Sequence, residues 1–142
     1  MKILVATDGS EPALHAVAYA ARLVGLMPSA SNAVTLISVH DDVGLRHAKS
    51  YVGSEAVAGY LRDLSEEELA PARKLLEAAG VRHAVETRTG HVAQQIVDCA
   101  EAGAFDLIVL GAKGRGAVSD LLLGSVAQRV LATAKQAVLL VK

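Results

Sequence analysis

The chain alternates between short aliphatic runs and longer stretches in which apolar residues recur at helical spacing. Runs of this kind, rich in Val, Leu and Ile, are typical of strands buried in a parallel sheet. The stretches between them place Leu, Val and Ala three or four positions apart, as on one face of a helix. The expected strands cover residues 2–6, 33–39, 81–87, 105–110 and 137–141. The expected helices cover residues 11–24, 54–79, 92–102 and 125–133.

Strict alternation of strands and helices predicts a parallel sheet with right-handed crossover connections and helices on both faces. In such sheets ligands bind at the carboxyl ends of the strands, near the point where the strand order reverses. The first strand leads into Asp8 and the fourth into Gly111, so we expect these two residues in one crevice. At 142 residues the chain is most simply one domain, residues 1–142.

Two segments depart from the alternation. Residues 40–53 are polar and irregular, which predicts a long loop. Within residues 54–79, Pro71 lacks the N–H that a helix interior needs, so we expect a kink or break just before it. A fresh helix that begins at Ser65 is the alternative, because Ser-Glu-Glu-Glu has capping-box spacing. The expected third strand alternates only partly, which favours an edge position.

Composition narrows the function classes. Hydrophobic residues make up 52% of the chain and charged residues 20%, as in globular proteins. A formal net charge of −1 and only 3% aromatic residues argue against binding to nucleic acid. The single Cys99 excludes an intrachain disulfide and fits a reducing compartment. The first apolar run is too short for a signal peptide, and no stretch reaches the roughly 20 residues of a membrane span, so we expect a soluble, cytoplasmic protein.

The segment from Gly111 to Ser125 joins the fourth expected strand to the last expected helix. Glycines there let backbone amides close around an anion, and a helix start adds unpaired N–H groups and the positive end of a dipole. The spacing is not that of a P-loop, because Lys113 precedes Gly114 and does not follow the last glycine. A dinucleotide fingerprint, G-x-G-x-x-G, would follow the first strand, whereas these glycines follow the fourth and have the reversed spacing. The pattern present is Gly111-x2-Gly114-x9-Gly124-Ser125.

This pattern resembles the ATP-binding motif of the universal stress protein family, and the resemblance covers nearly the whole chain. The chain opens with Ile-Leu-Val-Ala-Thr-Asp-Gly-Ser, carries Val39-His40 at the end of the second strand, and closes with Val-Leu-Leu-Val. The resemblance implies a three-layer α/β/α, Rossmann-like fold with five parallel strands in the order 3-2-1-4-5. It also implies a homodimeric stress-response sensor or regulator that binds ATP, ADP or AMP, with or without Mg²⁺, and that binds nucleotide in preference to turning it over.

The resemblance also implies roles for single positions. The end of the first strand would meet the base and ribose, the main chain of Val39 would border adenine, and residues 124–126 would cradle the phosphates. Independently, the backbone amides of those residues and the Ser125 hydroxyl are suitable donors for phosphate oxygens. The expected nucleotide-binding residues are Ala6, Thr7, Asp8, Val39, Gly111, Ala112, Lys113, Gly114, Arg115, Gly124, Ser125 and Val126. The expected dimer contact is the last strand, with Val138, Leu139, Leu140 and Val141.

One position departs from the family pattern in a way that bears on the ligand. Asp120 stands where the family commonly has a basic residue, and an acid near a triphosphate weakens binding or requires a divalent cation. Two other functions therefore stay open. One is a slow ATPase in which Asp8 holds Mg²⁺ of Mg-ATP, although no catalytic residue is evident. The other is an interaction module without nucleotide.

Several residues also have simpler interpretations. Asp8 and Ser125 are each suited to be only the N-cap of the helix that follows. The segment with His40, Asp41, Asp42 and His47 has metal-ligand chemistry but lacks helical spacing of its histidines, so a solvated loop is preferred and no metal site is expected. Cys99 is expected to be a small buried side chain and not a nucleophile.

Overall fold

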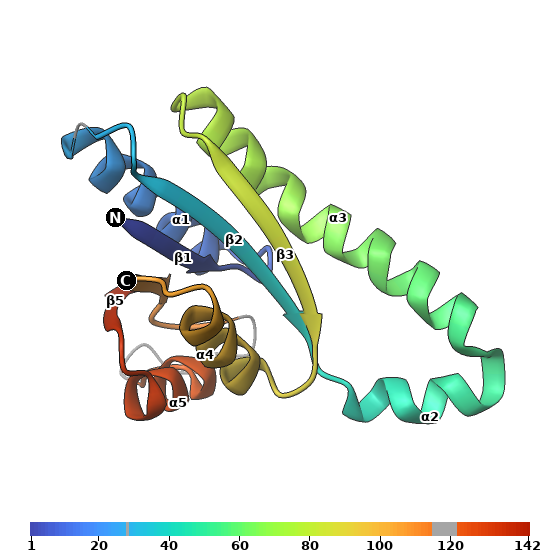
Figure 1. The fold of residues 1–142 in the computed structure, drawn as a ribbon. Coiled ribbons are helices and arrows are strands. Elements are labelled where there is room, and N and C mark those ends of the chain that lie inside the picture. Colours follow the sequence, from blue (N-terminus) through green and yellow to red (C-terminus); the bar gives the residue numbers. More distant parts are fainter. Residues whose placement is uncertain (28, 115–121) are drawn as a thin grey trace.

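The structure, a computed structural model, describes residues 1–27, 29–114 and 122–142. Within these residues the strands form one parallel sheet (Figure 1) in the order β3-β2-β1-β4-β5. The predicted order 3-2-1-4-5 is therefore confirmed, and β3 lies at an edge as its pattern indicated. The strands are β1 (Lys2–Ala6), β2 (Ala33–His40), β3 (His83–Thr89), β4 (Leu107–Gly111) and β5 (Ala137–Val141).

Helices cover both faces of this sheet and bury its aliphatic side chains. On one face α1 (Glu11–Leu26) and α3 (Ser54–Ala78) pack over a cluster that includes Ile3, Val5 and Leu36. On the other face α4 (Val92–Ala102) and α5 (Ser125–Thr133) pack over a cluster that includes Leu4 and Ile108. Successive residues of β1 thus alternate between the two cores, and all of Ile3, Leu4 and Val5 are fully buried.

The prediction of a long loop over residues 40–53 is wrong, because α2 (Val43–Val52) occupies most of it. The helix begins with local contacts: Asp41 Oδ1 accepts a hydrogen bond from the Val43 amide at 2.9 Å, and Arg46 donates to Asp42 Oδ2 at 2.7 Å. The Arg46 hydrogen bond also lowers the pKa of Asp42. No side chain of α2 is buried, and the charged and polar residues of this segment led to the loop prediction although its apolar residues recur at helical spacing.

The expected break before Pro71 is also wrong, since α3 continues from Ser54 to Ala78 through the proline. Pro71 and Glu67, whose carbonyl loses its helical N–H partner, both lie on the exposed side of the helix. Water can therefore satisfy that carbonyl, and the ring does not disturb the core. Ser65 is buried in the middle of α3, so no fresh helix begins there.

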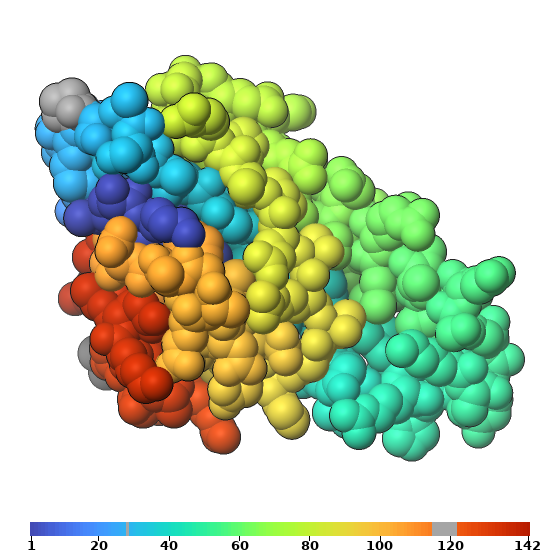
Figure 2. Space-filling model, viewed as in Figure 1, coloured from blue at the N-terminus to red at the C-terminus, as the bar shows by residue number. Residues whose placement is uncertain are grey.

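The helix α2 and the adjoining half of α3 extend away from the sheet (Figures 1 and 2). In the space-filling view these residues, coloured teal to green, form a projection on one side of the molecule. The apolar side chains of Tyr51, Val52 and Tyr60 are exposed there. Across the described ranges, none of the helices combines the length and the apolar composition that crossing a membrane requires.

Candidate functional site

A cavity of about 490 Å³ opens at the carboxyl ends of β1, β2 and β4. A volume of this size is typical of small-ligand sites. Apolar side chains of β2, α4 and β4 line one part of it: Ile37, Val39, Val92, Ile96 and Leu110. Asp8 lines another part, together with Gly111, Gly114 and Gly124. The cavity therefore has an apolar region beside a region dominated by backbone groups.

The structure brings most of the predicted site residues together in the lining of this cavity. Those that line it are Ala6, Thr7, Asp8, Val39, Gly111, Gly114, Gly124, Ser125 and Val126. Ala112 and Lys113 do not line it. Ala112 directly follows β4 and is buried. Its amide donates to the Val141 carbonyl at 2.8 Å, and its carbonyl accepts from the Gly124 amide at 2.8 Å. Arg115 and the unusual Asp120 lie outside the described residues.

Apart from Val39, sequence reasoning missed the apolar part of the lining. Ile37, Leu110, Val92 and Ile96 were assigned to strands and a helix, with no role in a site. The signal that could have found them is geometric: Val92 and Ile96 are four positions apart on one face of α4, at the carboxyl edge of the sheet. Ala13, Leu122, Leu123 and Ala127 complete the described lining.

The turn after β1 is ordered by its own short polar side chains. Thr7, only 5% exposed, accepts a hydrogen bond at Oγ1 from the Gly9 amide at 3.2 Å. Asp8 Oδ1 accepts one from the Ser10 amide at 2.9 Å. Ser10 is the N-cap of α1, and its Oγ accepts from the Ala13 amide at 3.4 Å. The simpler interpretation of Asp8 as the cap of α1 is therefore wrong, and Asp8 shapes the turn that leads to the cap.

The glycines of the motif are required for different reasons. A Cβ on Gly111 would lie 2.9 Å from the Pro12 carbonyl oxygen, closer than a side chain tolerates. A Cβ on Gly124 would lie 3.2 Å from the Gly114 nitrogen and 3.4 Å from Lys113 Cα. These two glycines allow backbone segments to pack together. Among the described residues, a Cβ on Gly114 would meet Asp8 Oδ2 at 3.6 Å, an ordinary contact distance, so Gly114 lies beside Asp8 at the cavity wall.

The first turn of α5 lies at the cavity wall. Its N-cap is Gly124, and no side chain in the described part of the chain makes a capping hydrogen bond there. Ser125 is the first helical residue and is exposed, so the interpretation of Ser125 as the N-cap is wrong. The N–H groups of a helix's first turn have no partner within the helix and carry the positive end of its dipole. The wall formed by Gly124, Ser125 and Val126 is thus suited to an anion.

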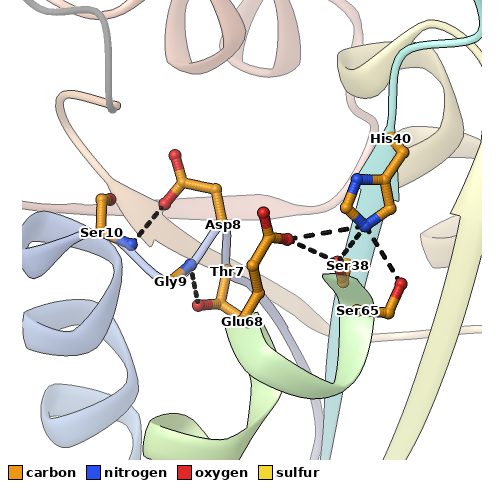
Figure 3. Close-up of polar contacts among 8 residues, drawn as sticks. All are labelled: Thr7, Asp8, Gly9, Ser10, Ser38, His40, Ser65 and Glu68. Atoms are coloured by element: carbon orange, nitrogen blue, oxygen red, sulfur yellow. Dashed lines mark hydrogen bonds and ion pairs between the residues drawn. The ribbon is translucent and has the colours of Figure 1, made fainter. Parts of the chain in front are cut away.

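A second group of polar residues lies on the opposite face of β2 (Figure 3). His40 Nε2 lies 3.0 Å from Ser65 Oγ, 3.3 Å from Ser38 Oγ and 3.6 Å from Glu68 Oε2. These contacts converge on one ring nitrogen, unlike a catalytic triad, in which the acid and the nucleophile use different nitrogens. Nothing in the sequence predicted this cluster, because its partners are separated by 25 and 30 positions.

The candidate metal and thiol positions do not form reactive centres. Among residues 1–27, 29–114 and 122–142, no three His, Cys, Asp or Glu side chains are grouped so that they could hold a metal ion. Cys99 is buried in α4, as expected, and its Sγ donates to Glu86 Oε2 at 3.4 Å. Burial, with the Glu86 contact, raises the pKa of the Cys99 thiol to about 11. The thiolate that would act as a nucleophile is therefore scarce near neutral pH.

Comparison with known proteins identifies the family. A model of the universal stress protein family matches residues 1–142. The chain belongs to the universal stress protein family. A curated relative, the universal stress protein MJ0531 of Methanocaldococcus jannaschii, is 35% identical to it over 141 residues, which cover 99% of this chain and 81% of the relative.

Solved structures agree with the fold of this universal stress protein. The hypothetical protein MJ0577 is 27% identical with a TM-score of 0.77, covering 99% of this chain and 94% of the other. A universal stress protein in complex with cAMP is 24% identical with a TM-score of 0.67, covering 100% and 97%. An Arabidopsis thaliana family member with AMP bound is 15% identical with a TM-score of 0.67, covering 100% and 91%. Solved family members thus include two that hold adenine nucleotides.

Proposed function

We propose that this universal stress protein binds an adenine nucleotide, ATP, in the cavity at the carboxyl ends of β1, β2 and β4. The observation that carries the proposal is the pairing, in a single cavity, of an apolar region with the first turn of α5, which no described side chain caps. An adenine base needs an apolar slot, and a phosphate chain needs backbone donors and a positive dipole end. One ligand that has both parts is a nucleoside phosphate.

The chemistry of the lining suggests how the ligand would be held. The base would pack against Val39 and Ile96, in the apolar region. Asp8, between that region and Gly114, is placed to accept hydrogen bonds from ribose hydroxyls. The phosphates would receive hydrogen bonds from the amides at the start of α5 and from the Ser125 hydroxyl. Mg²⁺, if it accompanies the nucleotide, would be held chiefly by the phosphates, with Asp8 as the nearest acid of the lining.

Two relatives support the choice of adenine. The family member that was solved with cAMP and the Arabidopsis thaliana member that was solved with AMP have the same fold as this chain. The Gly111-x2-Gly114-x9-Gly124-Ser125 pattern, with its resemblance to the family's ATP-binding motif, supports a triphosphate. These observations favour ATP over a ligand with a different base.

Calorimetric titration with ATP and adenosine tests this proposal. Wild-type protein is expected to bind both, ATP more tightly. Ser125→Glu places a carboxylate at an exposed position where phosphates would lie, and is expected to weaken ATP binding about a hundredfold through charge repulsion. Adenosine binding should change little. Ala132→Glu adds the same charge at an exposed position in the last turn of α5, and should leave both affinities unchanged.

We also propose that two copies of the chain pair through β5. This strand lies at the sheet edge, and the side chains of Val138, Leu139, Leu140 and Val141 are half-buried there. Because the Val141 carbonyl accepts from Ala112, the main chain of Val141 is directed inward, and that of Leu140 and Val138 is directed outward. An edge strand with outward N–H groups and partly exposed apolar side chains is a template for strand pairing.

Sedimentation analysis of two variants tests the dimer. Val138→Pro removes an outward N–H without removing a hydrogen bond to β4, and proline is tolerated on edge strands. We expect it to be monomeric, whereas Val138→Ala, which keeps the N–H, should remain largely dimeric. A wild-type protein that sediments as a monomer would contradict this proposal, and it would leave the nucleotide proposal standing.

A further inference from the structure

The side chain of Glu68 is unusually well enclosed for an acid on a helix surface. It is 10% exposed, and the neighbouring His40 side chain is 12% exposed. Ser38 Oγ donates a hydrogen bond to Glu68 Oε2 at 3.2 Å, and His40 Nε2 lies 3.6 Å from the same oxygen. Through these contacts the carboxylate of Glu68, which belongs to α3, is attached to the end of β2.

The other end of the same residue supports the turn that carries Asp8. Gly9 has a φ of +79°, a conformation that side chains rarely adopt. A Cβ at Gly9 would meet Glu68 Cα at 3.2 Å and Glu68 Cγ at 3.3 Å. The backbone and the stem of Glu68 therefore lie directly against the turn. Figure 3 shows Glu68 between this turn and the end of β2.

Both segments that Glu68 touches belong to one region of the cavity. The turn carries Asp8, and the end of β2 carries Val39, which lies between Ser38 and His40 and faces the cavity from the opposite side of the strand. The phosphate region at Gly124 and Ser125 belongs to other elements. Glu68 does not line the cavity, and its contacts with Ser38 and Gly9 join it to elements that carry the lining.

We propose that Glu68 is a positioning residue for the base and ribose region of the nucleotide site. By packing against Gly9 and bonding Ser38, it fixes the distance between Asp8 and Val39 without touching the ligand. Binding groups act best when packing and second contacts hold them in place before the ligand arrives. This inference rests on the proposed nucleotide function and names the residue that sets the geometry of one half of the site.

The inference is tested by comparing how one substitution changes the affinities for two ligands. Glu68→Ala is expected to weaken adenosine binding about tenfold and to leave the affinity for tripolyphosphate, measured by competition with ATP, unchanged. Glu68→Gln keeps the stem and an oxygen that accepts from Ser38, so it should restore most of the adenosine affinity. Glu67→Ala removes an exposed acid from the adjacent position and serves as the matched control. Equal losses for both ligands would indicate general destabilisation and would overturn the proposal.

A second readout does not depend on any ligand. In the free protein, amide exchange at Gly9 and Ser10, whose N–H groups donate to Thr7 and Asp8, should accelerate in Glu68→Ala. Exchange at Gly124, whose amide donates to Ala112, should not change. Unchanged exchange at Gly9 and Ser10 would overturn the positioning role even if ATP binds. Absence of any ATP or adenosine binding by wild-type protein, with the exchange difference present, would instead overturn the nucleotide function.

Discussion

Three helices begin beside the cavity, α1, α4 and α5, and the first turns of α1 and α5 differ in kind. The helix α1 has a serine N-cap whose hydroxyl accepts from Ala13, an acid at Glu11 and a proline at position 12. The helix α5 has Gly124 as its N-cap, and no side-chain cap or first-turn acid among the described residues. Each feature of α1 satisfies or neutralises the N–H groups of a helix start. The described residues at the start of α5 provide no side-chain cap, acid or proline of this kind.

The difference shows how one sheet edge is divided between structure and function. At α1 the chain satisfies its own helix start, and Asp8 is held in the preceding turn by the Ser10 amide. At α5 no described side chain satisfies the helix start, so we expect its amides to serve an external anion, which a serine or aspartate N-cap would have displaced. The glycine at the cap is also required for packing, because a Cβ there would approach the Gly114 nitrogen. A ligand site and a tight backbone contact thus share one residue.

The largest expected effect concerns the contact between Gly111, at the end of β4, and Pro12, at the start of α1. In Gly111→Val the new side chain would meet the Pro12 carbonyl at the start of α1, and the backbone there cannot easily give way. We expect a loss of about 3 kcal/mol in the free energy of unfolding, measured by urea denaturation. Gly59→Ala, in α3 with nothing within 4 Å of its Cβ, should stabilise the protein. A neutral Gly111→Val would show that the two regions do not pack as described.

An intermediate effect is expected at Gly114, which lies beside Asp8 at the cavity wall. Gly114→Val should fold normally, because a Cβ there meets only Asp8 Oδ2 at 3.6 Å. The added methyl groups would occupy ligand space, so ATP affinity should fall about tenfold. Calorimetry measures the affinity, and Gly44→Val, at another open position far from the cavity in α2, is the control. Equal ATP affinities for the two variants would mean that the ligand does not approach Gly114.

The smallest expected effect separates stability from binding. Ser10→Ala removes the N-cap of α1 and should lower the free energy of unfolding by about 1 kcal/mol. ATP affinity should remain that of the wild type, because Ser10 does not line the cavity and its amide still donates to Asp8. Urea denaturation and calorimetry on the same preparation measure both quantities. A large loss of affinity would show that the start of α1 also serves the ligand.

Sequence patterns predicted the sheet well because its signals are local. The strands are aliphatic runs bounded by glycines and polar residues, and the helices that cover them carry regular apolar faces. The helix α2 was not predicted, because its charged and polar residues resemble those of a loop and it buries no side chain in the core. The break predicted before Pro71 was wrong because the energetic effect of a proline inside a helix is not local to the sequence. Its cost depends on whether the freed carbonyl faces water, which the exposed side of α3 provides.

For the site, the sequence indicated the segments but not their contacts. The glycine spacing and the end of β1 pointed to residues that do line one cavity. The apolar region around Ile96 and Leu110 was missed, since a residue of a cavity lining has the same apolar pattern as a residue of the core. The contact of Glu68 with Gly9 joins positions 59 residues apart along the chain, and no local pattern encodes such a pair.

The central claim is that ATP places its phosphates at the start of α5 and not at the start of α1. Titration of ¹⁵N-labelled protein with ATP, followed by NMR of the backbone amides, tests it most directly. We predict large, saturating shifts at Ser125 and Val126, and little change at Ala13 and Leu14, whose amides already donate to Ser10. Saturating shifts confined to α1, or no shift at α5 with ATP in excess, would contradict the account.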